Sequence, residues 1–215
     1  MRSSHSIGWH CRPTAVYSHV VKRFLTRLLL VLLLSAGFAL ALLLWRSPDA
    51  TYRMRELVAF GRYHKYDRLI ENAAKKYGVD PMLVKAVVWR ESRFLPDKVG
   101  GAGERGLMQV GEAAARDWAV AHKNEVFVYP DLFDAKTNIE AGTWYLGQAL
   151  ERWKDRDDPV AFALSEYNAG RTRVEKWAVK TQTARKMLDQ SAAGSTRRYA
   201  DEIIRRYRLY REHGW

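Results

Sequence analysis

The sequence predicts an all-α protein in which a single transmembrane helix precedes one helical domain. Two observations lead to this prediction. Residues 28–45 form a run of 18 consecutive residues without a charge, and the residues beyond it carry repeated helix signals but few strand signals. The chain has 215 residues, so 170 remain after the run, which is enough for one domain with a sizeable core.

Residues 28–45 are predicted to be an uncleaved membrane anchor, because a helix of this length can cross a hydrocarbon core. A cleavable signal peptide has a shorter apolar region followed by small residues, whereas Leu42, Leu43, Leu44 and Trp45 are bulky. A buried core helix is a poor alternative, because a helix that is apolar on all sides needs protein all round it. No other segment is similarly apolar.

The charges around the anchor predict its orientation. No acidic residue precedes residue 46, and the basic residues there are Arg2, Arg12, Lys22, Arg23 and Arg27. Basic residues accumulate on the cytoplasmic side of membrane helices, so we expect the N-terminal tail to face the cytoplasm. The predicted parts are a basic cytoplasmic tail at 1–27, the transmembrane anchor at 28–45, a linker at 46–62 and the helical domain at 63–215.

The composition limits the chemistry of the exported part. Cys11 is the only cysteine and lies in the predicted cytoplasmic tail, so we expect no disulfide and no lipoprotein processing. The net charge is +12, of which the first 45 residues contribute +5 and the rest +7. A basic surface suits cell-wall polymer, membrane headgroups or nucleic acid, and the chain has no recognised nucleic-acid motif. The six histidines lack ligand spacing, so no metal or cofactor is predicted.

The first two helices of the domain have clear boundaries in the sequence. Apolar residues recur at helical spacing from Tyr66 to Tyr77, and Gly78 supplies a stop. Asp80 followed by Pro81 is typical of an N-cap and first helical position, so a second helix is predicted to run from there to about Glu91.

Later helices are predicted from similar signals. One lies near Glu112 to His122, and the capping-box spacing of residues 137–140 begins a long helix. Asp158 and Pro159 repeat the cap and proline, and a last helix presents Tyr199, Ile203, Tyr207 and Tyr210 on one face. Two stretches are predicted to be irregular: the glycine-dense loop at 100–106 and the polar segment at 180–196.

Glu91 is the candidate for acid catalysis. On a helix, Val87, Val88 and Glu91 all fall within roughly 60 degrees of Val84, so Glu91 lies on the apolar face. Burial of a carboxyl group raises its pKa and leaves it able to donate a proton near neutral pH. The alternative is a capping or salt-bridged glutamate, with Arg90 and Arg93 as available partners, and Glu91 taken alone favours that alternative.

Two further clusters accompany Glu91. Residues 106–109 form a glycine turn, two apolar side chains and Gln109, whose amide suits hydroxyl and acetamido groups. The turn could instead fill the core, with Gln109 capping the next helix. Tyr167 shares a helix face with apolar residues, so its hydroxyl needs a buried partner, either Glu91 or a backbone group.

The three clusters in order are Glu91-Ser92, Gly106-Leu107-Met108-Gln109 and Tyr167-Asn168-Ala169-Gly170. This ordered set resembles the soluble lytic transglycosylase catalytic domain family, and the similarity runs from about Tyr66 to Tyr210, including residues 138–146. The resemblance implies a lysozyme-like helical domain with a central substrate cleft. It also implies a membrane-anchored enzyme of the bacterial inner membrane whose domain faces the periplasm or cell wall.

The resemblance implies cleavage of peptidoglycan glycan strands between N-acetylmuramic acid and N-acetylglucosamine, with formation of 1,6-anhydro ends. Glu91 would act first as acid and then as base. Ser92 would support the active loop, Gln109 would bind the sugar, Tyr167 would lie beside Glu91, and Tyr199 would hydrogen-bond it. The residues expected to contact or support the substrate are Ser92, Met108, Gln109, Tyr167, Asn168 and Tyr199.

The chain departs from the common pattern of that family in the loop before Gly106 and at Glu166. Gly100 stands where many members carry serine, the pair Glu104-Arg105 stands where small residues are usual, and Glu166 replaces a frequent alanine. Glu104 is expected to be a solvated charge paired with Arg105 or Arg171. Turned inward, it would give the paired carboxyl groups of a hydrolase.

Three alternatives to a lytic transglycosylase therefore stay open: a lysozyme-like muramidase, a non-catalytic wall-binding module and a membrane-surface protein. The retained acid Glu91 speaks against the second, and the last helix lacks the broad apolar stripe required by the third. The expected partners are peptidoglycan strands and the inner membrane through residues 28–45, with no nucleic acid. Any wall-remodelling partner is left unidentified by the sequence.

Overall fold

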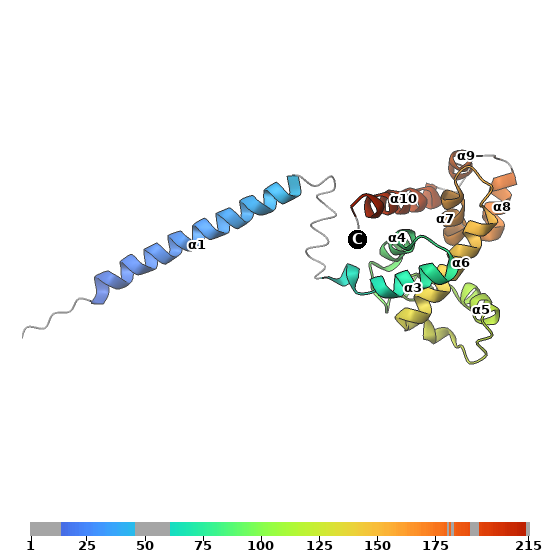
Figure 1. Ribbon diagram of the computed structural model, residues 1–215, viewed down its shortest axis with the longest axis horizontal. Coiled ribbons are helices and arrows are strands. Elements are labelled where there is room, and N and C mark those ends of the chain that lie inside the picture. The colour runs from blue at the N-terminus through green and yellow to red at the C-terminus, as the bar shows by residue number, and fades with distance from the viewer. Residues whose placement is uncertain (1–13, 46–60, 180, 182, 190–193, 214–215) are drawn as a thin grey trace, which may run out of the picture. The chain divides into compact units, whose positions relative to one another are not determined.

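The computed structural model describes residues 14–45, 61–179, 181, 183–189 and 194–213. Contacts divide the chain into two units, residues 1–60 and 61–215. In the first unit, helix α1 runs from Thr14 to Trp45 (Figure 1). Its segment Val21–Leu42 is long and apolar enough to cross a membrane, and none of that segment is buried. The predicted anchor at 28–45 lies within α1, whereas most of the predicted linker lies outside the described residues.

The second unit is helical. The β structure among its described residues is limited to isolated bridges, which join Val99 to Arg105 and Arg105 to Val110. This arrangement agrees with the predicted all-α class. Its helices are η1 (Arg62–His64), α3 (Asp67–Tyr77), α4 (Pro81–Ser92), α5 (Glu112–Ala121), η2 (Tyr129–Phe133), α6 (Ala135–Arg152), α7 (Pro159–Ala169), α8 (Arg171–Val179), α9 (Ala184–Asp189) and α10 (Ser195–His213).

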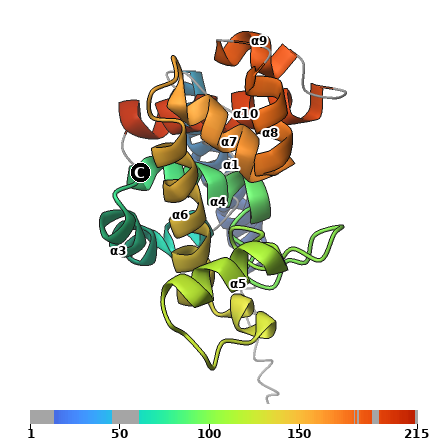
Figure 2. The ribbon, with the colours of Figure 1, turned by 90° about the vertical axis from the view of Figure 1, so that its right-hand side faces the viewer.

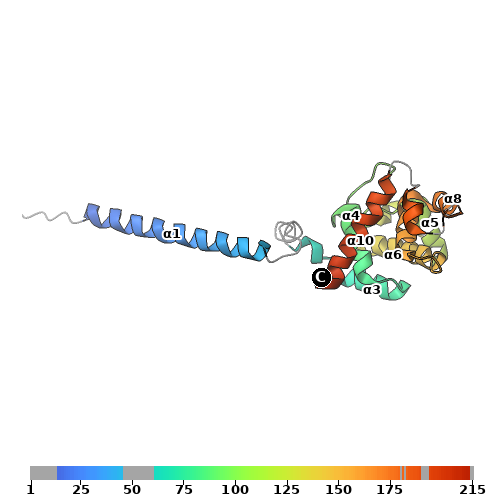
Figure 3. The ribbon, with the colours of Figure 1, turned by 90° about the horizontal axis from the view of Figure 1, so that it is seen from above.

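Helices α4 and α6 organise the core. Helix α10 packs on α4, which also contacts α3 (Figure 3). Helix α6 packs against α3, α5 and α7, and Figure 2 shows it running between α7 at one end and α5 at the other. Every residue from Leu83 to Trp89 is buried. The sequence predicted one apolar face on α4, but the helix is enclosed on all sides over these two turns.

The predicted caps are present at three helix ends. Asp80 accepts a hydrogen bond from the backbone N–H of Met82, and Asp158 accepts one from that of Ala161. Gly78 ends α3 in the left-handed conformation, with φ of 67°. These ends fix where α3, α4 and α7 start or stop, and thereby where Glu91 and Tyr167 fall on the last turns of α4 and α7.

Two boundary predictions were wrong. Helix α6 begins at Ala135, not at Thr137, because Asp134 is its N-cap and accepts a bond from the Thr137 backbone at 2.8 Å. The segment predicted to be irregular contains α9, whose Ala184, Met187 and Leu188 are buried. Three apolar residues in so short a helix give too little periodicity to stand out in a polar stretch.

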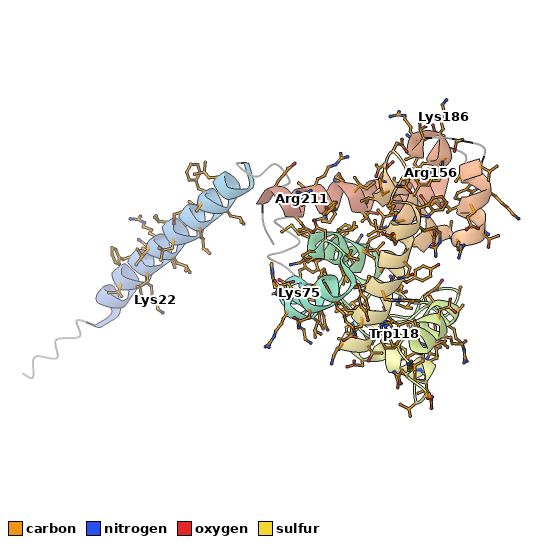
Figure 4. All side chains as sticks on the ribbon, turned by 45° about the vertical axis from the view of Figure 1, so that its right-hand side comes forward. Lys22, Lys75, Trp118, Arg156, Lys186 and Arg211 are labelled. Atoms are coloured by element: carbon orange, nitrogen blue, oxygen red, sulfur yellow. The ribbon has the colours of Figure 1, made fainter. Side chains whose placement is uncertain are left out.

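Charged side chains lie mainly at the surface of the second unit. Lys75, Lys186 and Arg211 project outward from α3, α9 and α10 in Figure 4. The side chains of Lys85, Glu166 and Arg206 are buried exceptions. Lys85 is fully buried within α4 and forms an ion pair with Asp67 of α3 at 2.8 Å. Such a pair braces α4, the helix that carries Glu91, against its neighbour.

Candidate active site

Glu91 lies on the last turn of α4, where the chain turns sharply. Arg93 and Phe94 both adopt positive φ, 54° and 62°, so the helix ends directly after Ser92. One carboxylate oxygen of Glu91, Oε1, accepts a hydrogen bond from the hydroxyl of Tyr199 on α10 at 2.5 Å. Lys98 donates a hydrogen bond to the backbone carbonyl of Glu91. The expected contact between Tyr199 and Glu91 is therefore present.

Burial raises the pKa of Glu91 above its usual value. The Tyr199 hydrogen bond and the charges of Arg90 and Lys98 act in the opposite direction, because each favours the ionised carboxylate. The charge of Glu104 adds to the increase. The net direction is upward, so this carboxyl group keeps its proton to higher pH than an exposed glutamate does.

Neither arginine beside Glu91 forms an ion pair with it. Arg90 and Arg93 both bind the carboxylate of Glu202 on α10, at 2.7 and 3.3 Å. Among the described residues, Glu91 is therefore not salt-bridged, and that alternative is wrong. Its only side-chain partner there is the neutral phenol of Tyr199.

The carboxyl group of Glu91 faces a cavity of about 750 Å³. One wall is the loop after α4, another is the start of α5, and the remaining side comes from α6 and α7. A cavity of this size suits a ligand of several rings. Its lining consists of Glu91, Lys98, Val99, Gly100, Gly101, Ala102, Glu104, Gln109, Val110, Gly111, Glu112, Ala113, Ala114, Asp117, Tyr145, Tyr167 and Asn168.

Gln109 closes the glycine-dense loop. Its side-chain N–H group donates to the backbone oxygens of Lys98 and Gly106, at 2.9 and 3.0 Å. A Cβ atom on Gly100 would lie 2.8 Å from the Gln109 side-chain oxygen and 2.4 Å from a carboxylate oxygen of Glu104. A larger residue at position 100 would therefore displace the ends of the Glu104 and Gln109 side chains, and the amide N–H of Gln109 is already committed to the protein.

Asn138 of α6, which sequence reasoning did not assign to the site, holds the next turn. Its side chain is fully buried and accepts from the Met108 backbone at 2.7 Å. It also donates to the carbonyl oxygens of Arg105 and Leu132. A Cβ atom on Gly106 would lie 2.2 Å from the Asn138 amide. The only sequence signal was its place in a segment that resembles the family.

Tyr167 reaches the same turn from α7. Its hydroxyl donates to the Met108 carbonyl at 2.9 Å, so of the two partners left open by the sequence the backbone group is the correct one. Gly142 of α6 leaves room for this junction, since a Cβ there would lie 2.6 Å from the Met108 sulfur. Burial raises the pKa of both Tyr167 and Tyr199 well above the usual range, so both remain protonated donors.

The other predicted residues divide between the cavity and the core. Asn168 lines the cavity, and its side-chain oxygen accepts from the Thr196 hydroxyl at 2.9 Å. Ser92 is buried and donates to the Val88 carbonyl at 3.2 Å. Met108 is also fully buried. Neither Ser92 nor Met108 lines the cavity, so their positions support the cavity wall and give no direct contact.

Glu104 does not form either expected ion pair. Arg171 pairs with Glu175 at 2.7 Å, and the Arg105 guanidinium lies over the Tyr129 ring at 4.1 Å. The Glu104 carboxylate instead accepts the backbone N–H of Ala102 at 3.0 Å and lines the cavity. The tight glycine turn directs it inward, which the residue type alone did not reveal. Tyr145 and Lys98 are further lining residues that sequence reasoning missed.

Residues 68–190 match the family model described as the transglycosylase SLT domain. The chain belongs to this family. An SLT relative named membrane-bound lytic murein transglycosylase F, from Desulfosudis oleivorans, is 35% identical over 114 residues, which are 52% of this chain and 23% of the relative. Membrane-bound lytic murein transglycosylase C from Yersinia enterocolitica is 42% identical over 87 residues, covering 40% and 24%. The chain thus matches about a quarter of these relatives' length.

A solved structure of the SLT family has the same fold. The 70 kDa soluble lytic transglycosylase from Escherichia coli aligns with a TM-score of 0.62 and 24% identity, over 68% of this chain and 24% of that one. The likeness establishes the lysozyme-like helical fold expected from the sequence. Among the described residues of the present chain, no group of histidine, cysteine or acidic side chains could hold a metal ion.

Proposed function

We propose that this protein is a peptidoglycan lytic transglycosylase in which Glu91 acts first as acid and then as base. A single observation carries the proposal: a partly buried carboxyl group with a raised pKa faces a cavity and is held by a neutral phenol. The names of the two relatives, both murein transglycosylases, support the same substrate class.

The proposed reaction needs one carboxyl group. Protonated Glu91 gives its proton to the oxygen between N-acetylmuramic acid and N-acetylglucosamine as the C1–O bond breaks. The resulting carboxylate removes the proton from the muramoyl C6 hydroxyl, which bonds to C1 and forms the 1,6-anhydro ring. Glu91 is then protonated again, so the cycle consumes no water. The substrate supplies its own nucleophile.

The remaining residues have supporting roles in this proposal. Gln109, Asn168 and Tyr167 border the cavity and would contact the sugars or shape the wall beside them. Tyr199 would orient Glu91 through its hydroxyl. Ser92 and Met108 would act indirectly, by anchoring the end of α4 and the turn at residues 106–109.

Membrane attachment is part of the proposal. Helix α1, the basic residues before it and the relatives named as membrane-bound support a single-pass anchor in the inner membrane, with the domain facing the cell wall. The parts would be a cytoplasmic tail at 1–27, the anchor at 28–45, a linker at 46–62 and the catalytic domain at 63–215. Peptidoglycan strands would be its substrate.

The test is product analysis with Glu91→Gln. The full chain in detergent is incubated with purified peptidoglycan, and the released muropeptides are analysed by mass spectrometry. We expect 1,6-anhydro ends from the wild type and a loss of at least about 100-fold in Glu91→Gln, because general acid catalysis contributes that much. Glu71→Gln, which changes an exposed glutamate of α3, serves as the matched control and should retain full activity.

A second candidate, a muramidase, is favoured by one observation: the carboxylate of Glu104 lines the same cavity as Glu91. Hydrolysing glycosidases use two carboxyl groups that flank the bond. Reducible ends that disappear in Glu104→Gln would establish hydrolysis. Anhydro ends that persist in Glu104→Gln would establish the transglycosylase. An inert wild type that still binds peptidoglycan would indicate a wall-binding module.

A further inference from the structure

Glu202 forms ion pairs with Arg90 and Arg93, the two arginines nearest the candidate acid in sequence. Arg90 and Arg93 flank Glu91 in sequence, and either would be an ordinary partner for a glutamate. The Arg90 Nε atom lies 2.7 Å from one Glu202 oxygen, and Arg93 Nη2 lies 3.3 Å from the other. Each oxygen of this one carboxylate therefore binds a different arginine.

Glu202 and Tyr199 are three residues apart on α10, so they lie on the same helix face. This face packs on α4, where Tyr199 meets Glu91 and Glu202 meets the arginines. The Arg90 guanidinium lies over the Tyr199 ring at 5.3 Å. The same face of α10 thus places the neutral hydroxyl of Tyr199 beside Glu91 and the negative carboxylate of Glu202 beside Arg90 and Arg93.

Aromatic contacts hold the arginines in these positions. The Arg93 guanidinium lies 3.4 Å from the centre of the Trp89 ring. The guanidinium of Arg206 on α10 lies 3.9 Å from the centre of the same ring. Arg90 and Arg93 are about one-third exposed, at 35 and 37%. Partial burial weakens screening by water, so an unneutralised charge here would act strongly on Glu91.

We propose that Glu202 is a positioning residue of this site. By binding Arg90 and Arg93, it neutralises their charges beside Glu91 and fixes the helix face that brings Tyr199 to the carboxyl group. Glu91 thereby keeps the proton that it must donate. The inference rests on the proposed function, because it concerns the proton used in that reaction.

Other charged and titratable groups also face Glu91. Tyr199 approaches from α10, Tyr167 from α7, and Lys98 and Glu104 from the loop after α4, while Tyr145 of α6 lines the same cavity. The phenols are neutral, and Lys98 is bonded to the Glu91 carbonyl. Within the described part of the chain, the ion pairs of Glu202 are those with Arg90 and Arg93, so a change at Glu202 acts on Glu91 through the arginines and Tyr199.

The test is the pH profile of Glu202→Gln in the full chain, measured with soluble peptidoglycan fragments. Freed arginines favour the ionised form of Glu91, so the alkaline limb of kcat should move to lower pH by about one unit. Activity near neutral pH should fall about tenfold, while the acidic plateau and KM change less than about twofold. Glu175→Gln, which removes the exposed carboxylate paired with Arg171, is the matched control and should not move the limb.

Two further variants separate electrostatics from simple bracing. In the Glu202→Gln background, Arg90→Gln removes the freed charge and should return the limb toward higher pH. Glu202→Asp should give an intermediate profile. Arg90→Gln alone should move the limb above that of the wild type, because the Arg90 charge lowers the pKa of Glu91. This single variant keeps the test available where Glu202→Gln does not fold.

Two outcomes would overturn the inference. One is an equal loss of activity at every pH, which indicates a structural brace only, and the other is an unchanged profile. Failure of the proposed function looks different, because the wild type would then release no anhydro product. A second readout needs no activity: the ¹³C signal of the Glu91 carboxyl, identified by its loss in Glu91→Gln, should titrate at lower pH in Glu202→Gln.

Discussion

At the residue scale, Glu91 is subject to opposing influences. Burial favours its protonated form, while the Tyr199 hydroxyl and the nearby cations favour the ionised form. The structure limits the second influence by giving Glu91 a neutral partner and directing both flanking arginines to Glu202. A group that must both give and take a proton benefits from such a balance, because neither state is strongly trapped.

Tyr199→Phe tests this balance. A hydrogen bond to a carboxylate stabilises the ionised form, so removing the hydroxyl should raise the pKa of Glu91 further. The alkaline limb of the kcat profile should therefore move to higher pH, opposite to the effect expected for Glu202→Gln. The maximal rate should fall about 100-fold, because Glu91 loses the contact that orients it. A limb that moves to lower pH would contradict the assignment.

At the element scale, short caps place the functional side chains. Helix α7 begins at the Asp158 cap and ends at Gly170, and this length puts Tyr167 and Asn168 at its C-terminal turn, beside the cavity. Helix α4 is fixed in the same way by Asp80. A helix that began one residue later would rotate its side chains by about 100 degrees relative to the cap.

Asp158→Ala should destabilise the domain by about 1 kcal/mol, because the backbone N–H of Ala161 loses its partner. Thermal unfolding followed by circular dichroism should show a Tm lower by about 2 to 4 °C. Asp155→Ala, in the exposed turn just before α7, is the control and should leave Tm unchanged. Equal Tm values for the two variants would show that Asp158 does not stabilise α7.

At the scale of the whole molecule, the charge distribution predicts a topology. Cys11, the only cysteine, lies before α1 and outside the described residues. In intact cells, a membrane-impermeant maleimide should not label Cys11, and permeabilised cells should show labelling. Added protease should digest residues 61–215 only once the outer barrier is opened. If Cys11 were labelled when only the outer barrier is opened and the inner membrane is intact, the proposed orientation would be wrong.

Helix ends and the site residues differed in how well they could be predicted. The Asp-Pro pairs and Gly78 marked α3, α4 and α7 because capping is local chemistry. Helix α6 was misplaced because Asp134 and Thr137 both suit a cap within one turn, and packing selects between them. The roles of Asn138 and Tyr145 depend on contacts between distant segments, which no local pattern encodes. The direction of Glu104 depends on the conformation of its own loop, which the residue types alone do not specify.

The sequence by itself determined the helical class, the apolar N-terminal helix, the family and the identity of the candidate acid, because periodicity, length and ordered motifs are all local properties. Only the tertiary structure decided which groups touch that acid. In the folded chain, Tyr199 donates a hydrogen bond to Glu91, and Tyr167 donates one to the Met108 carbonyl. Both arginines form ion pairs with Glu202. The reason is physical: the protonation state of a carboxyl group depends on burial and on charges within a few ångströms, and folding brings those groups together.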